Sequence, residues 1–320
     1  KEKGIAMLLT TPDVIRTLQR KLYRKAKQEP AYRFYALYDK VWRADILMFA
    51  YRLVRANQGS PGVDGVNFEE IEQKIGIDAF LSALAQDLKE KTYRPDPVRR
   101  VMIPKADGSQ RPLGIPTIRD RVAQMAVKLI IEPIFEADFC PNSYGFRPKK
   151  SAHEAVDEIA EALHQGHTQV IDADLSKYFD SIPHAKLLAV IAERIVDGGI
   201  LHLIKLWLKA PVIGEAEDGT RKVVGGGKRN SKGTPQGGVI SPLLSNCYLH
   251  LLDRIWERHQ LRWKLKARIV RYADDFVVLC AGKVEEPLAW VRHVLERLEL
   301  TLNENKTRIV DAREESFTFL

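Results

Sequence analysis

One short stretch constrains this chain more than any other. Residues 269–279 read Ile-Val-Arg-Tyr-Ala-Asp-Asp-Phe-Val-Val-Leu, so two apolar, β-prone runs flank the adjacent carboxylates Asp274 and Asp275. This pattern predicts a β-hairpin with both acids at or beside its tip. Adjacent carboxylates repel each other unless a cation lies between them, and hard oxygen ligands suit Mg²⁺. Taken alone, such a tetrad more often marks a solvated turn, so its meaning depends on the rest of the chain.

Length and charge narrow the class of protein. The chain has 320 residues, of which 45% are hydrophobic, enough for a large core and two lobes or subdomains. Its net charge of +8 and pI of about 9.2 favour an anionic partner, with nucleic acid as the first candidate. An ordinary basic surface would give the same charge.

The cysteines and the apolar runs exclude several other classes. Cys140, Cys247 and Cys280 are far apart and form no Cys-x-x-Cys pair, which indicates reduced intracellular thiols and neither a zinc site nor a disulfide framework. No apolar run reaches the ~18 residues of a membrane span, and the N-terminus lacks the apolar core of a signal peptide. We therefore expect a cytoplasmic protein of bacterial type with no membrane partner.

The N-terminal region combines basic and aromatic side chains. Residues 13–56 are predicted to be helical, and basic residues such as Arg20 and Arg24 lie between aromatics such as Tyr23 and Tyr35. This pattern can hold a sugar-phosphate backbone and stack on bases, although a solvated amphipathic helix with core aromatics explains it nearly as well. Residues 57–65 contain three glycines and one proline, which predicts a shaped loop. A further helix is expected over residues 69–92.

A basic hairpin is expected over residues 98–116. Two extended arms surround an Asp-Gly turn, and a four-residue loop would bring Lys105 and Arg111 close together across the arms. Two cations held side by side can grip a triphosphate, with the Arg side chain supplying a forked donor. An exposed strand edge protected by charge is the alternative interpretation.

A glycine-rich turn precedes a long buried helix. A second hairpin is expected over residues 211–232, and residues 233–238 (Gly-Thr-Pro-Gln-Gly-Gly) then open a helix that ends near Arg258. The turn places free backbone N–H groups and the amide of Gln236 at a helix N-terminus, which suits an anionic ligand.

A second acidic strand end lies upstream. Residues 169–175 read as a strand that carries Asp174. An α+β sheet layer covered by helices on one face would satisfy the order of elements. If this strand lies beside the 269–279 hairpin, Asp174 meets Asp274 and Asp275 at one edge. Three carboxylates can hold two Mg²⁺ ions roughly 3.5–4 Å apart, one activating a 3′-hydroxyl and the other neutralising pyrophosphate.

Several motifs together resemble one family. The sequence Tyr-Ala-Asp-Asp at residues 272–275 resembles the signature of reverse transcriptases. Other segments resemble further motifs of the same family, in the family's order, over roughly residues 57–320. Residues 60–65 resemble the N-terminal extension of group II intron reverse transcriptases (maturases), and residues 143–148 resemble another group II motif. The fingers motif is matched by residues 105–116, the first catalytic-aspartate motif by residues 174–180, and the Pro-Gln-Gly motif by residues 234–238. Each match is weak or moderate alone, whereas the ordered set is specific.

The resemblance implies the ligands of the metal ions. Asp174, Asp274 and Asp275 would be catalytic residues that bind two Mg²⁺ ions, and the carbonyl of Leu175 would add an oxygen. Asp275 would be the least engaged of the three carboxylates.

The resemblance also implies how a dNTP substrate is bound. Lys105 and Arg111 would grip the triphosphate, and Gln236 would line the nucleotide or template pocket. Phe179 occupies the steric-gate position, where an aromatic ring blocks a ribose 2′-hydroxyl, with core packing as the alternative. Lys306 occupies the position of a general acid for pyrophosphate, or is a plain surface lysine.

Three polar residues near Asp174 in the sequence are interpreted as structural. His184 follows a proline at a helix start, and Asp172 and Asp180 flank the Asp174 motif with expected salt-bridge or turn roles. Asp64 either stabilises the turn in its loop or helps that loop to grip RNA.

We therefore expect an α+β right-hand polymerase fold limited to fingers and palm, with an antiparallel palm sheet packed on helices. Residues 1–165 would form the N-terminal extension and fingers with some palm, and residues 166–320 the palm. The resemblance implies that the family's thumb and later domains would follow Leu320 and are absent here, in agreement with the apolar run in which the chain ends.

The expected activity is RNA-directed DNA synthesis on an RNA template from a DNA primer, together with binding of intron RNA. A homodimer is left open. The alternatives are an RNA-binding splicing maturase with little polymerase activity, and a CRISPR-linked, retron or other bacterial reverse transcriptase.

Overall fold

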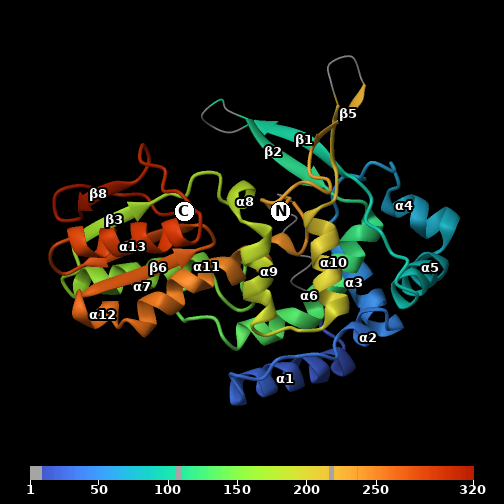
Figure 1. Ribbon diagram of the computed structural model, residues 1–320, viewed down its shortest axis with the longest axis horizontal. Helices are drawn as coiled ribbons and strands as arrows, with labels where there is room; N and C mark the ends of the chain where they lie inside the picture. Colours follow the sequence, from blue (N-terminus) through green and yellow to red (C-terminus); the bar gives the residue numbers. More distant parts are fainter. Residues whose placement is uncertain (1–8, 105–107, 109, 216–219, 236) are drawn as a thin grey trace. The chain divides into compact units, whose positions relative to one another are not determined.

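The computed structural model describes residues 9–104, 108, 110–215, 220–235 and 237–320 (Figure 1). The chain forms two compact units, each built from two segments. Unit 1 comprises Lys1–Asp138 and Leu188–Ser241, and unit 2 comprises Phe139–Leu187 and Pro242–Leu320. The division into fingers and palm with a boundary near residue 165 stays a prediction.

Unit 1 is built around one buried helix, α6 (Ile118–Glu136). Thr117 caps this helix by accepting a hydrogen bond from the backbone N–H of Asp120, and apolar side chains line α6 on almost every side because other helices surround it. The other helices are α1 (Asp13–Gln28), α2 (Tyr38–Val41), α3 (Ala44–Ala56), α4 (Phe68–Glu70), the π-helical turn η2 (Ile71–Ile75), α5 (Ile77–Lys89) and α10 (Gly198–Leu208). The helix α9 (His184–Ala192) spans the sequence boundary between the units.

Two hairpins form the four-stranded sheet of unit 1. The strands β1 (Val98–Pro104) and β2 (Gln110–Ile115) pair antiparallel, and so do β4 (Val212–Glu215) and β5 (Arg221–Gly225). A short parallel pairing of β1 with β4 joins the hairpins in the order β2-β1-β4-β5. Both hairpins were predicted, whereas their union into one sheet was not.

Unit 2 holds an antiparallel sheet in the order β6-β7-β3-β8. Its strands are β6 (Ala267–Tyr272), β7 (Asp275–Cys280), β3 (Gln169–Ala173) and β8 (Arg308–Asp311). The central strands β7 and β3 are mostly apolar, and their apolar residues are buried, as expected for strands covered on both faces. The predicted α+β class with an antiparallel sheet is confirmed.

Helices cover both faces of this sheet. On one face, Ala155, Ile159 and Ala162 of α7 (Ala152–His164) pack against Val270 and Val277. On the other face, the side chain of Arg271, which follows Val270 and therefore points to the opposite side, forms an ion pair with Asp253 of α11 (Ser241–Arg258) at 2.6 Å. The short helix α12 (Leu261–Lys264) and α13 (Glu285–Arg297) complete the unit (Figure 1). The expectation of helices on one face only was therefore wrong.

Several helix predictions need correction. The predicted helix over residues 13–56 is interrupted between α1 and α2, where Phe34 forms a backbone bridge with Ile195. The predicted helix over residues 69–92 contains a π-helical turn that ends at Gly76, whose φ of +85° suits glycine. Ser151 and Glu154 form a capping box at the start of α7. Among the described residues, no helix is both long and apolar enough to cross a membrane.

Candidate active site

The two adjacent acids lie at the turn between β6 and β7, as predicted. Tyr272 pairs with Asp275 across the hairpin, so Ala273 and Asp274 alone form the loop. Ala273 has a φ of +59°, a left-handed conformation that costs a non-glycine residue about 1–2 kcal/mol. The surrounding contacts must therefore hold this turn in place.

Asp174 lies at the same end of the sheet. The strand β3 runs antiparallel to β7, with Ala173 opposite Phe276, so the next residues along the two strands are Asp174 and Asp275. The side-chain amide of Asn303 donates a hydrogen bond to the Asp174 carboxylate at 2.9 Å, and its backbone N–H donates to the Asp174 carbonyl at 2.8 Å. Asn303 thus fixes the orientation of Asp174, a role that the sequence had not suggested.

The electrostatics of Asp275 show that the acids act on one another. Partial desolvation and, after it, repulsion from Asp274, Asp174 and Asp172 together raise the pKa of Asp275 to about 6, while the positive charge of Lys306 acts in the opposite direction. The three predicted catalytic carboxylates and Lys306 therefore share one end of the sheet. Among the described residues, however, no three acid, histidine or cysteine side chains already form a metal-binding group. The carboxylates fit a hard cation by their chemistry and their shared charge.

A buried ion pair next to the acidic turn holds the turn in place. Arg271 and Asp253 are both fully buried, and the guanidinium donates to the carboxylate at 2.6 Å. A further guanidinium nitrogen donates to the carbonyl of Ala273 at 2.8 Å and to Asn246 Oδ1 at 2.9 Å. Arg271 therefore tethers the left-handed residue of the turn to α11, which also carries Asn246 and Asp253.

A loop from residue 142 to residue 145 closes over the same turn. The backbone N–H of Arg271 donates to the carbonyl of Asn142 at 2.9 Å, and the N–H of Tyr144 donates to the carbonyl of Arg271 at 2.8 Å. A Cβ atom on Gly145 would lie 2.2 Å from the backbone nitrogen of Ala273. The motif at residues 143–148 thus has a structural purpose, since only a glycine permits this close approach.

Of the residues predicted to bind the triphosphate or template, the structure describes Arg111, which belongs to unit 1. Arg111 lies exposed on β2 opposite Ile103. Lys105 and Gln236, which were predicted to help bind the nucleotide, lie outside the described residues. A Cβ atom on Gly237 would lie 2.3 Å from the carbonyl of Gly114, so the turn before α11 packs closely on β2.

The loop at residues 57–65 is held by hydrogen bonds within unit 1. The guanidinium of Arg121 donates to the carbonyl of Ser60 at 2.8 Å, and that of Arg221 donates to the carbonyl of Val63 at 3.1 Å. Asp64 accepts a hydrogen bond from the N–H of Val66 at 3.2 Å, which is the turn-stabilising role that had been one of two interpretations.

The remaining predicted residues surround the Asp174 strand. Phe179 is half-buried in the short helix α8 (Tyr178–Ser181), where its ring lies edge-on to that of Tyr178. Asp172 forms an ion pair with Arg308 at 3.3 Å, as expected. His184 is buried at the start of α9, in agreement with a structural role.

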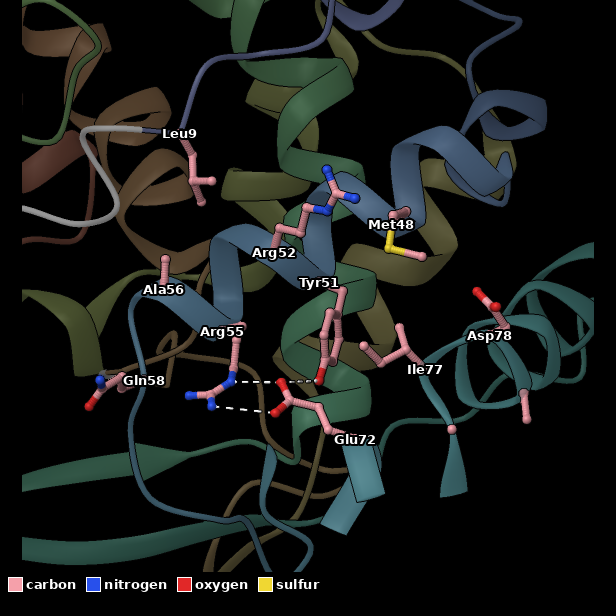
Figure 2. A pocket seen from close by; sticks show the side chains of 12 residues that line it. Leu9, Met48, Tyr51, Arg52, Arg55, Ala56, Gln58, Glu72, Ile77 and Asp78 are labelled. Carbon is pink, nitrogen blue, oxygen red and sulfur yellow. Dashed lines mark hydrogen bonds and ion pairs between the residues drawn. The ribbon is translucent and has the colours of Figure 1, made fainter. Parts of the chain in front are cut away.

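A separate cavity of about 920 Å³ lies in unit 1 between α3 and the η2–α5 region (Figure 2). Glu72 accepts hydrogen bonds there from Arg55 at 2.8 Å and from the hydroxyl of Tyr51 at 3.2 Å. Other charged side chains, such as Arg52 and Asp78, also line the cavity. The predicted acids are all in unit 2, so this cavity is not the candidate active site.

Comparison with known proteins identifies the family. The model of the family described as reverse transcriptase (RNA-dependent DNA polymerase) matches residues 103–320. The chain belongs to the reverse transcriptase family. The match includes Arg111, the strand β3 with Asp174, and the whole β6–β7 hairpin, so the predicted resemblance is confirmed.

Individual reverse transcriptase relatives agree with the resemblance to the group II branch. The chain is 36% identical to Protein YkfC of Escherichia coli over 96% of its own length and 87% of that protein. It is 33% identical to the group II intron-encoded protein LtrA of Lactococcus lactis over 87% of its own length, but it spans only 43% of LtrA.

Solved structures show weaker likeness. A chain of a partial Cas6-RT-Cas1–Cas2 complex matches with 23% identity and a TM-score of 0.43, over 81% of this chain and 42% of that one. Telomerase from Candida tropicalis matches with 13% identity and a TM-score of 0.47, over 76% of this chain and 46% of that one.

Proposed function

We propose that this chain is the polymerase part of a group II intron-type reverse transcriptase, which extends a DNA primer on an RNA template. The observation that carries the proposal is the convergence of Asp174, Asp274 and Asp275 at one end of the unit 2 sheet, where their charges act on one another. The similarity to LtrA supports the group II branch.

The acids would bind Mg²⁺, and the half-buried Asp174 would be the best oriented of them because Asn303 holds its carboxylate. When bound, two such ions lower the pKa of an attacking hydroxyl and neutralise a leaving pyrophosphate. The protein's own part is to position the reactants and to supply positive charge.

Other residues would select and hold the nucleotide. Phe179 follows Asp174 on α8 and presents a half-buried ring that would exclude a ribose 2′-hydroxyl. Arg111 is an exposed guanidinium on β2, suited to forked contacts with a triphosphate. The exposed Lys306 lies close enough to lower the pKa of Asp275, which supports its assignment beside the leaving pyrophosphate.

The test is primer extension by this chain with dNTPs and Mg²⁺ on an RNA template. Asp274→Asn should abolish synthesis, and Asp180→Asn is the matched control because it removes an exposed carboxylate from the neighbouring α8. Equal loss of synthesis in both variants, or full synthesis by the folded Asp274→Asn protein, would disprove the assignment.

A second function, binding of intron RNA to assist splicing, is favoured by the surface of α1. This helix buries Ile15, Leu22 and Ala26 and leaves Arg20 and Tyr23 exposed. A cationic and aromatic face suits a sugar-phosphate backbone with unstacked bases. Retention of RNA binding by the Asp274→Asn protein would separate this function from polymerisation, and the same binding without any synthesis by the unaltered protein would favour a splicing cofactor.

A further inference from the structure

A basic and aromatic surface lies at the end of the unit 2 sheet that is opposite the aspartates. The strand β6 has six residues, so its ends are roughly 17 Å apart. The helix α12 comes just before the start of this strand (Figure 1), whereas the acidic turn follows its end. A ligand bound at α12 would therefore occupy a site separate from the acids.

The charge of this segment is strongly one-sided. Residues 254–268 contain six lysine or arginine side chains and one glutamate. Arg262 and Arg268 line a small cavity of about 310 Å³ together with acidic side chains of α7, such as Glu158, which offset their charge. Lys264 and Lys266 are exposed and are not part of that lining, so their charge is available to an anionic partner.

The exposed ring at the centre of the surface is Trp263. Its side chain is 74% exposed, whereas Trp207 and Trp256 are 4% and 2% exposed. The Arg262 guanidinium lies 5.4 Å from the centroid of the Trp263 ring. Packing of the core does not require an indole at this position, whereas an open aromatic face beside cations is the arrangement on which nucleic-acid bases stack.

The backbone holds this ring on a defined platform. Gln260 adopts a left-handed conformation with a φ of +55° at the start of α12, and its carbonyl accepts a hydrogen bond from the N–H of Trp263 at 3.0 Å. Just before this turn, the ring of His259 packs against Trp290 of α13, with centroids 4.8 Å apart. The platform is thus anchored to a neighbouring helix.

We propose that Arg262, Trp263, Lys264 and Lys266 form a binding surface for single-stranded RNA, in which a base stacks on Trp263 and the two lysines contact phosphates. Single-stranded RNA supplies negative phosphates that complement the lysines and unstacked bases that can stack on the exposed indole ring. The proposal presumes a chain that acts on RNA, as proposed above, but it does not involve the catalytic acids. The surface would hold RNA outside the polymerase site.

The test measures the fluorescence anisotropy of a labelled 20-nucleotide oligouridylate, with excess unlabelled primer–template present to occupy the polymerase site. Trp263→Ala should weaken binding about 5- to 150-fold, as for loss of one base–aromatic stack of about 1–3 kcal/mol. Lys264→Ala with Lys266→Ala should reduce the slope of log affinity against log salt by about 1.4, since each phosphate contact on a single strand contributes about 0.7.

The matched control is Lys283→Ala with Arg297→Ala, which removes two exposed positive charges elsewhere in unit 2 and should leave the salt slope unchanged. Circular dichroism and thermal melting confirm that each variant is folded. Unchanged affinity in Trp263→Ala, or an equal loss in the control pair, would overturn the proposal. So would a change in sedimentation alone, which would indicate a contact between protein chains.

Failure here is distinguishable from failure of the proposed function. Primer extension by Trp263→Ala at saturating template should equal that of the unaltered protein, because the platform and the acids lie at opposite ends of β6. If the unaltered protein shows no synthesis while Trp263-dependent binding persists, the polymerase assignment fails and the RNA surface stands.

Discussion

Removal of the buried guanidinium beneath the acidic turn should damage both stability and synthesis. Arg271→Met leaves the Asp253 carboxylate fully buried without its cation, and it removes the donors to Asn246 and to the carbonyl of Ala273. Loss of one partner of a buried ion pair typically costs 3–5 kcal/mol. We therefore expect a decrease of about 3–5 kcal/mol in the free energy of unfolding of unit 2. This is a large part of the total, since domains are stable by only about 5–15 kcal/mol.

A double variant separates the two effects. Arg271→Met with Asp253→Leu removes the unpaired charge as well, and such apolar replacement of a buried pair often restores stability. Asn142 would still lose its acceptor on Asp253, a loss of about 1–3 kcal/mol, so we expect recovery of about half of the stability. The carbonyl of Ala273 would remain without its donor, and synthesis should stay low.

Urea unfolding and primer extension, both at a temperature where each variant is folded, measure these outcomes. A stability loss below about 1 kcal/mol in Arg271→Met would contradict the estimate for the buried pair. Recovery of synthesis along with stability in the double variant would show that Arg271 has no role in positioning the turn.

Three further predictions concern other buried or crowded positions. Burial lowers the pKa of His250 to about 4. Because the unfolded chain takes up the proton first, the folded protein should lose about 3 kcal/mol of stability as the pH falls from 6.5 to 4. Urea unfolding at both pH values should show this loss, and His250→Phe should lack it. Gly145→Ala should reduce synthesis and stability because its Cβ would meet the backbone of Ala273 at 2.2 Å, whereas Gly282→Ala, which has open space around it, should have no effect on either. Phe179→Ala should raise incorporation of ribonucleotides roughly ten- to a hundredfold, because it relieves a steric clash of about 1–3 kcal/mol with the 2′-hydroxyl. Unchanged ribonucleotide incorporation would refute the role of Phe179 as a steric gate.

Local sequence patterns predicted most of the elements of the sheet in unit 2. The apolar, β-prone runs on each side of Asp274 and Asp275 correctly predicted β6, β7 and their tight turn. The run that carries Asp174 correctly predicted β3. Local patterns could not predict the parallel pairing of β1 with β4, because two strands so far apart in sequence carry no local mark of their partner.

The interruption after α1 did have a local signal. Pro30 follows Glu29, the C-cap residue just after α1, and a residue before proline is disfavoured in helical conformation. The prediction of a helix over residues 13–56 followed the basic and aromatic composition of the whole segment and gave no weight to this proline. The bridge between Phe34 and Ile195 then keeps the segment extended, an influence from distant sequence that no local pattern contains.

The residues that support the acidic turn could be found only in part from the sequence. Arg271 is a charged residue within a strand of buried apolar neighbours, which is in itself a signal because a buried cation requires partners. On α11, Asn246 and Asp253 are two helical turns apart and therefore share one face, but nothing in the sequence states that this face meets β6. The acids of the turn repel each other, and Ala273 is left-handed, so the turn does not hold itself in place. The forked guanidinium of Arg271 joins the acid of α11 to the carbonyl of the turn, and a lysine at this position would lack the second arm. The geometry of the predicted catalytic acids thus depends on a side chain that is completely shielded from solvent.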